Sequence, residues 1–394
     1  MPIINRIADF HADLTAWRQE MHRHPETAFE EEWTSAFVAE KLESFGIEVH
    51  RGIARTGVVG VLRGRDGSGA ARAIGLRADM DALDITEATG LPYASERHGK
   101  MHACGHDGHT AMLLGAARYL AETRNFDGTV YFIFQPAEEN EGGARAMIEE
   151  GLFERFPMDA VYGMHNRPGL PVGEMQMRSG PSMAGFDVFE IVIDGYGTHA
   201  ARPHQGIDPI IVQAQIVMAL QTIASRQIDP IESVVLSVTQ VHGGDTWNVI
   251  PPQVVLRGTV RCFKPEVQDR TEAAMRRICA NVAAAHEASV TVRYERRYPP
   301  LVNDAAHIDI CAQVAAEVCG AGNVTVGAPP AMGSEDFAFM LEEKPGAYVN
   351  IGNGAVGEKG GTVVHNPGYD FNDEALTWGA TFWTKLVEKT LPRG

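Results

Sequence analysis

One short segment of the sequence concentrates side chains that bind transition metals. Residues 101–110 read Met-His-Ala-Cys-Gly-His-Asp-Gly-His-Thr, so Cys104 and His106 lie beside two further histidines. Thiolate and imidazole groups are ligands for transition metals, and the glycine between them allows two ligands to face one ion. We therefore predict a metal-binding turn ahead of a helix. The alternative is a loop that is rich in histidine without any ligand role.

A pair of adjacent glutamates, Glu138 and Glu139, marks a second segment. The pair lies in Phe-Gln-Pro-Ala-Glu-Glu-Asn-Glu-Gly-Gly (134–143), directly after an apolar run that we expect to be a buried strand. Paired carboxylates can divide the work, because one can bind a metal ion while the other transfers protons. A solvated acidic loop is the alternative. The position at a strand end favours chemistry, since the sites of α/β proteins collect there.

Two single histidines add further donors. His165 follows the run Ala-Val-Tyr-Gly-Met, and His365 lies in Thr-Val-Val-His-Asn-Pro-Gly near the end of the chain. A single histidine after a strand is more often structural than a metal ligand. Here the total number of donors matters, because two ions with open positions for water and substrate need about this many ligands. The candidate ligands are Cys104, His106, Glu139, His165 and His365.

The elements around these segments predict an α/β sheet covered by helices on both faces. Apolar residues at helical spacing alternate with short apolar runs bounded by glycine, which is the pattern of strands that alternate with helices. Residues 64–69 read as a turn. The expected helices are 4–17, 32–45, 109–123, 308–318 and 372–388, and the expected strands are 58–62, 74–76, 130–134, 160–163 and 347–351.

The middle of the chain has a different order of elements. Strands are expected at 186–193, 233–241, 253–263 and 289–294, and helices at 208–226 and 265–287. The order βαββαβ is that of a small ferredoxin-like domain. We therefore expect this domain at 184–296, inserted into a catalytic domain made of residues 1–183 and 297–394.

Composition restricts the classes of partner. The net charge of −17 weighs against nucleic acid or an anionic membrane surface, although a small anionic substrate remains compatible with a local cationic pocket. The first residues lack the apolar run of a signal peptide, and no stretch is long enough to span a membrane, so we expect a cytoplasmic protein. Five cysteines without CxxC spacing argue against a disulfide framework.

The sequence resembles the dinuclear metal aminoacylase family, which includes hippurate hydrolase and the plant auxin-conjugate amidohydrolases. Carboxypeptidase G and succinyl-diaminopimelate desuccinylase are more distant members of the same group. The resemblance runs nearly end to end. It rests on HRHPE (22–26), RADMDAL (77–83), MHACGHDGHTAMLLGAA (101–117), QPAEENEGGARAMIEEG (135–151), GMHNRP (163–168), GTHAARPH (197–204), NVIPP (248–252), GSEDF (333–337) and HNPGYDFND (365–373).

The resemblance implies a fold, an activity and a set of roles. It implies a metallopeptidase-like catalytic domain that hydrolyses the amide bond of N-acyl amino acids with two divalent metal ions per subunit. Glu138 is implied as the general base and acid, and the five candidate ligands as the metal ligands. The inserted domain is implied to be a lid that forms much of a homodimer interface. Thiolate and imidazole suit zinc, whereas carboxylate-rich sites also accept manganese, with cobalt and nickel as further options.

Some residues near the motifs have supporting roles. The distant relatives carry a metal-binding histidine where this chain has Arg77, and in the nearer branch the Cys-Gly-His segment takes over ligation. Asp79 is then a candidate to orient a ligand, or else a loop aspartate that holds a turn. Asp107 and His109 orient the metal loop or cap the following helix, and we expect His22 to be structural.

Four residues of the lid are candidates for substrate binding. His199 and Asn248 resemble residues that reach a substrate's scissile carbonyl or its carboxylate, in the partner subunit's active site. The alternative for His199 is a surface histidine beside a turn. Arg257 and Arg261 lie on one face of the same strand, where either could bind a substrate carboxylate with two hydrogen bonds. An ordinary strand surface is the alternative for this arginine pair.

Two rival functions remain open at this point. A dipeptidase or an N-acetyl-diaminopimelate deacetylase would use the same motifs, because the acyl pocket is set by lid and loop side chains. A non-catalytic metal-binding protein is the rival from a different class. The presence of all five ligand positions together with Glu138 favours an enzyme.

Overall fold

The computed structural model describes residues 3–65, 72–139 and 141–394, and their contacts divide them into two units. The first unit holds the described residues up to Gly180, together with Val302–Pro329 and Asp336–Gly394, and the second holds Pro181–Leu301 and Pro330–Glu335. Residues 330–335 thus group with the second unit, although the sequence suggested the first. The turn expected at 64–69 lies largely outside the described residues.

A mixed eight-stranded sheet forms the centre of the first unit. The central strands are rich in valine, isoleucine and phenylalanine and are buried along nearly their whole length, as expected for strands covered on both faces. The predicted α/β class is confirmed. In sheet order the strands are β1 (Glu48–Ile53), β2 (Gly57–Arg63), β4 (Thr129–Gln135), β3 (Ala73–Asp79), β5 (Ala160–Pro168), β16 (Gly346–Gly354), β6 (Met175–Met177) and β15 (Val324–Val326).

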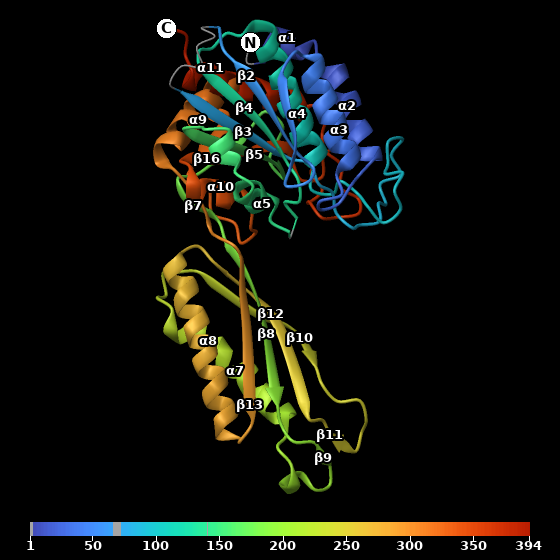
Figure 1. Cartoon of the computed structure of the whole chain (residues 1–394), viewed down its shortest axis with the longest axis vertical. Helices are drawn as coiled ribbons and strands as arrows, with labels where there is room; N and C mark the ends of the chain where they lie inside the picture. Colours follow the sequence, from blue (N-terminus) through green and yellow to red (C-terminus); the bar gives the residue numbers. More distant parts are fainter. Residues whose placement is uncertain (1–2, 66–71, 140) are drawn as a thin grey trace. The chain divides into compact units, whose positions relative to one another are not determined.

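The helices of the first unit pack on this sheet and on one another (Figure 1). Helix α4 contacts β3, β4 and β5, while α2, α3 and α11 pack against α4. No helix among the described residues is both long enough and apolar enough to cross a membrane. The helices are α1 (Asn5–Ala8), α2 (His11–Arg23), α3 (Glu32–Ser44), α4 (His106–Thr123), α5 (Gly143–Glu149), α6 (Leu152–Arg155), α9 (Ala305–Cys319), α10 (Phe337–Glu343) and α11 (Ala375–Thr390).

The first helix differs from the expectation. The sequence predicted one helix over 4–17, but the chain forms α1 and α2 with Asp9 and Phe10 between them. The apolar periodicity continues through the break, since Ile7, Phe10 and Leu14 are all buried in the same core. Periodicity therefore located the buried face correctly and could not show the interruption.

The second unit contains the predicted βαββαβ order. Its antiparallel sheet has the order β10-β12-β8-β13, and buried and partly exposed residues alternate along β8, as in a sheet with one face covered by helices. The predicted ferredoxin-like order is confirmed. The elements are β8 (Gly185–Asp194), α7 (Pro209–Thr222), β10 (Val234–His242), β12 (Gln253–Cys262), α8 (Pro265–Ala285) and β13 (Ser289–Tyr298), with the short strands β9 (Thr198–His199) and β11 (Val249–Ile250).

The carboxyl ends of parallel strands place the chemical groups of the first unit. Strands β3 and β4 are parallel neighbours, and their last residues, Asp79 and Gln135, lie opposite each other. The segments that follow these two strands therefore leave the sheet at the same edge, and Glu138 lies on one of them. Strand β5 runs parallel on the other side of β3 and carries His165 within the strand itself, not after it as the sequence suggested.

Candidate metal centre

Helix α4 begins at His106, before the predicted start at His109. Gly105 precedes it with a φ of 92°, and a Cβ atom there would lie 2.4 Å from Tyr369 Oη and 2.5 Å from Asn166 Oδ1. Glycine is required because this left-handed conformation disfavours side chains and because the space is already filled. The tight turn places His106 and His109 on one face of the first helical turn, since residues three apart on a helix are neighbours.

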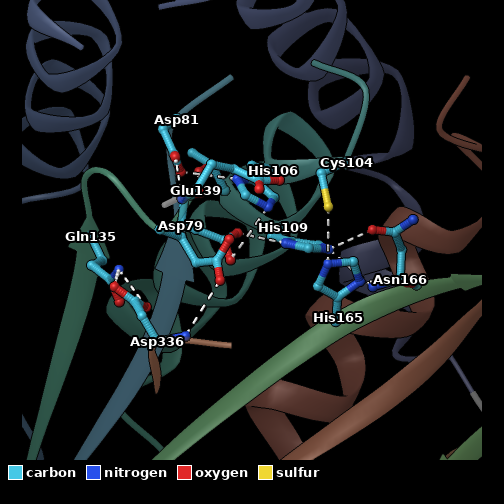
Figure 2. Close-up of polar contacts among 12 residues, drawn as sticks. Asp79, Asp81, Cys104, His106, His109, Gln135, Glu139, His165, Asn166 and Asp336 are labelled. Carbon is cyan, nitrogen blue, oxygen red and sulfur yellow. Dashed lines mark hydrogen bonds and ion pairs between the residues drawn. The ribbon is translucent and has the colours of Figure 1, made fainter. Parts of the chain in front are cut away.

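The five predicted metal ligands and Glu138 come together near this turn. Figure 2 shows four of the ligands, Cys104, His106, Glu139 and His165. Cys104 Sγ lies 3.3 Å from His165 Nε2, and His365 Nε2 lies 3.0 Å from Glu139 Oε1. Within each of three overlapping groups, the potential ligand atoms lie within 4.8 Å of one another. The groups are Cys104, His106 and His165; Cys104, Glu139 and His365; and His106, Glu138 and Glu139.

The chemistry of these residues fits divalent metal ions. His106 is 1% exposed, and its Nε2 has no hydrogen-bond partner among the described residues, although an imidazole nitrogen buried in this way is costly unless it binds something. Burial also raises the pKa of the Cys104 thiol to about 12. A thiolate at neutral pH would therefore need the positive charge of a bound ion. Nitrogen, sulfur and carboxylate donors are a set that zinc accepts.

Two aspartates orient the two histidines of helix α4. Asp81 Oδ1 lies 3.0 Å from His106 Nδ1, which leaves Nε2 directed at the candidate centre. Asp79 Oδ1 lies 2.6 Å from His109 Nδ1, and His109 Nε2 lies 2.7 Å from Asn166 Oδ1. Both ring nitrogens of His109 are thus engaged within the protein. A carboxylate that holds a ligand imidazole fixes its tautomer and ring direction.

Asp79 was the predicted orienting carboxylate, but the direct partner of His106 is Asp81. Asp79 Oδ2 is 3.7 Å from His106 Nε2, which exceeds hydrogen-bond distance, so Asp79 acts on His109 more directly. Asp81 also accepts a hydrogen bond from the Glu139 N–H at 2.9 Å, which joins two candidate ligands. The sequence signal that could have identified Asp81 is its alternation with Asp79 in RADMDAL, directly after a strand.

A buried charged network lies beneath these groups and was missed from the sequence. Arg77 donates to Asp79 Oδ2 at 2.7 Å and to Asp336 Oδ1 at 3.1 Å, and the Gln135 side chain also bonds with both Arg77 and Asp336. Arg77 is 1% exposed, and both aspartates are fully buried. Buried charges require such partners, because an unpaired charge in the interior is strongly unfavourable.

The other end of the metal loop is held by a second buried ion pair. His22 Nδ1 lies 2.8 Å from Asp107 Oδ2, and Asp107 also accepts a hydrogen bond from the Gly108 N–H. Burial disfavours the charged imidazole, but hydrogen bonds from His22 to Asp107 and Glu87 outweigh this and raise the pKa of His22 to about 9. His22 therefore supports the loop through Asp107, in agreement with its predicted structural role.

A pocket of about 480 Å³ lies beside the candidate ligand Glu139. Its lining combines apolar side chains, such as Phe29, Leu83 and Ile85, with acidic ones. A volume of this size lies within the range of small-molecule sites. The lining residues are Thr27, Ala28, Phe29, Glu30, Ala82, Leu83, Asp84, Ile85, Glu139 and Glu141.

The four predicted lid residues lie in the second unit. His199 is exposed and pairs with Val249 of β11, and the next residue's N–H donates to the Asn248 carbonyl, so His199 and Asn248 are neighbours. Arg257 donates to Glu190 Oε2 at 2.8 Å on the adjacent strand, which is an ordinary cross-strand ion pair. Arg261 donates to Ser334 Oγ at 2.6 Å.

Comparisons with known proteins agree with this geometry. Residues 75–389 match the model of peptidase family M20/M25/M40. Hippurate hydrolase of Campylobacter jejuni is 40% identical over 99% of this chain and 100% of its own length. N-acetylcysteine deacetylase of Bacillus subtilis is 40% identical over 96% of this chain and 97% of its own length. The Bacillus subtilis YXEP protein, a dinuclear metal-binding peptidase, has a TM-score of 0.85 and 38% identity, covering 98% of this chain and 99% of its own.

Proposed function

The chain belongs to peptidase family M20/M25/M40, and on this premise we propose that it hydrolyses the amide bond of N-acyl amino acids. The products are a carboxylic acid and a free amino acid. One observation carries the proposal: a Glu138 oxygen lies within 4.8 Å of potential ligand atoms of His106 and Glu139, and these two residues also belong to the groups that contain Cys104, His165 and His365. A carboxylate that is not needed as a ligand is available beside them for proton transfer.

The residues around the centre have separable roles in this reaction. Two bound divalent ions would lower the pKa of a water molecule toward about 7 and polarise the scissile carbonyl. Glu138 accepts the proton of the attacking water and then donates it to the leaving amine, which is the work of one group as general base and general acid. Asp81 keeps the His106 ring in the orientation that a ligand needs.

The substrate class follows from the relatives and from the pocket. Hippurate hydrolase and N-acetylcysteine deacetylase, each 40% identical to this chain, are named for N-acyl amino acid substrates. The pocket of about 480 Å³ beside Glu139 has room for an acyl group or an amino acid side chain. We propose two divalent ions per subunit, zinc or manganese, because the site combines thiolate and imidazole donors with a carboxylate.

A substrate panel with metal analysis tests this function. The metal-loaded enzyme is assayed on hippurate, N-acetylcysteine, other N-acyl amino acids, dipeptides and N-acetyl-diaminopimelate, with the acid and amine products both quantified. We expect equal amounts of the two products from acyl amino acids and about two ions per subunit. Preferred cleavage of dipeptides or of N-acetyl-diaminopimelate would replace the proposed substrate class. Full activity in metal-free protein would contradict the mechanism.

We further propose that the second unit forms a homodimer. Its β10 is an edge strand, and edge strands are sites where another chain can pair. Large apolar side chains are also exposed in this unit, and exposed apolar groups that gather on one surface mark interfaces. They include Ile211, Met218, Val241, Trp247 and Val249. The cytoplasmic location stays a prediction from the sequence.

The dimer proposal includes a role for His199 in the partner subunit's site. Sedimentation measures the mass, and Trp247→Asp should shift the protein toward monomer because it puts a charge in the proposed interface. Mixing inactive Glu138→Gln and His199→Ala proteins under subunit exchange should restore part of the activity, since one site of each mixed dimer has both native residues. A fully active monomer would contradict the shared site.

A further inference from the structure

Asp336 is a fully buried aspartate whose carboxylate is bound on both oxygens (Figure 2). Gln135 Nε2 lies 2.9 Å from each oxygen, and the Ala144 N–H donates to Oδ2 at 2.8 Å. Arg77 supplies a further hydrogen bond to Oδ1 at 3.1 Å. A carboxylate with several charge-assisted and neutral donors is held in one orientation, because each bond fixes a different direction.

The partners of Asp336 lie on both sides of Glu138 in the chain. Gln135 is the last residue of β4, and Ala144 lies in the first turn of α5. Between them, Ala137 has a φ of 53°, a left-handed conformation that a residue with a side chain rarely adopts. Such a conformation persists only when surrounding contacts hold it. The Asp336 carboxylate binds one residue on each side of Ala137 and Glu138 in the chain.

The main chain of Asp336 reaches Glu138 itself. The Asp336 N–H donates to Glu138 Oε1 at 3.3 Å. A fixed N–H bound to one oxygen restricts the orientation of a carboxylate. The side chain of Asp336 thus holds the turn, and its backbone orients the carboxylate on that turn.

We propose that Asp336 is a positioning residue for Glu138. Its carboxylate holds Gln135 and the Ala144 N–H, one on each side of Glu138 in the chain, and its own N–H binds Glu138 Oε1, so that the Glu138 carboxylate is kept in one orientation. The inference rests on the proposed function only for the role of Glu138. The rival is a purely structural role in which Asp336 neutralises Arg77 and contributes nothing to the placement of Glu138.

The substitution Asp336→Asn in the metal-loaded full chain separates these two roles. It keeps the size of the side chain but replaces one acceptor by a donor that faces Arg77, Gln135 or the Ala144 N–H. We expect kcat to fall about 10²-fold with little change in KM and in bound metal, since a small misplacement of a catalytic group is costly. Unchanged kcat, or equal loss of metal and activity, would contradict the proposal.

Asp187→Asn is the matched control, because Asp187 is also buried and accepts hydrogen bonds from Gln268 and Tyr294 in the second unit. It should leave kcat near that of the wild type even if it lowers the melting temperature. If Asp336→Asn folds poorly, Asp336→Ala with added formate replaces it, because formate can occupy the vacated carboxylate position. Recovery of kcat with formate and not with chloride supports the proposal, and its absence contradicts it.

A crystal structure of metal-loaded Asp336→Asn provides a measurement that does not depend on activity. We expect the Glu138 carboxylate to leave the N–H of residue 336 or to occupy more than one rotamer. A Glu138 carboxylate in its native position would overturn the proposal. If the wild type hydrolyses no acyl amino acid, the proposed function fails, and this crystallographic result still decides whether Asp336 positions Glu138.

Discussion

The predicted functional residues of the two units are held in different ways. In the first unit, His106 is 1% exposed and Asp79 is fully buried, and each has a carboxylate or imidazole neighbour that fixes its direction. In the second unit, His199 is exposed and its ring accepts a hydrogen bond, at 3.1 Å from the Ala201 N–H. The first unit thus holds its predicted residues in a buried, preorganised arrangement, whereas His199 lies on the surface of the second unit.

The largest expected effect comes from Glu138→Gln. The amide preserves the size of the side chain and can still accept the Asp336 N–H, but it cannot accept a proton from water. We expect turnover to fall by at least about 10²–10⁴-fold with both metals retained, as for the loss of a general base. Glu139→Gln is the paired control and should lose metal instead. Near-normal turnover of Glu138→Gln, measured with elemental analysis, would refute the assignment.

A smaller but still large effect is expected from His199→Ala. If His199 donates a hydrogen bond to the anionic tetrahedral intermediate, its removal should cost about 2–4 kcal/mol of transition-state stabilisation. Metal content and the fold of the first unit should not change. The measurement is kcat/KM with metal analysis, and the neighbouring exposed His204→Ala serves as the control. Equal kcat/KM for the two variants would show that His199 is a surface residue.

Asp81→Asn tests whether the first unit is preorganised by its supporting carboxylates. The amide keeps an acceptor for the Glu139 N–H but weakens the charge-assisted hydrogen bond to His106 Nδ1. We expect a loss of about 10–100-fold in metal affinity or activity. Competition with a chelator measures the affinity. If Asp79→Asn weakens metal binding more than Asp81→Asn does, Asp79 and not Asp81 is the main support of His106.

The smallest effect is expected from Arg257→Gln in the second unit. Arg257 pairs with Glu190 on the neighbouring strand, and Glu190 also binds Arg293. Exposed pairs of this kind contribute little to stability. We expect kcat/KM and KM to remain close to the native values. A large rise in KM would show that Arg257 binds the substrate carboxylate, as one interpretation of the sequence holds, and Arg293→Gln is the matched control.

Most strands and helices could be predicted because the spacing of apolar residues along a short segment largely determines which of the two it forms. The alternation expected at 186–193 and the helical periodicity expected at 265–287 located two of the six elements of the ferredoxin-like order, and the dense His-Cys segment pointed to the turn that holds Cys104 and His106. The supporting network could not be predicted in the same way. Asp336 and Gln135 are far apart in the sequence, and neither has a neighbour that signals their hydrogen bonds. Such pairs form only when the fold brings the end of β4 next to the start of α10.

The conformation of single residues also changed the expected arrangement of the site. The sequence suggested a turn before the helix at His109, whereas Gly105 allows the helix to start at His106 and brings two histidines to one helical face. The backbone angle of one glycine decided this, and residue type alone does not specify that angle. His365 likewise has a φ of 62°, which a sequence pattern does not reveal.

The position of β16 in the sheet has a consequence for the order of folding. This strand pairs in parallel with β5 and in antiparallel with β6, yet in the chain it follows the whole second unit. During synthesis, β5 can pair with β3 at once, but its other neighbour, β16, emerges only after the second unit, and a contact with so large a sequence separation forms slowly. His365 follows β16, so its contact with Glu139 forms only after this closure. Binding of a metal ion by His365 would then occur only after β16 has joined the sheet, so it would mark the end of folding of the first unit.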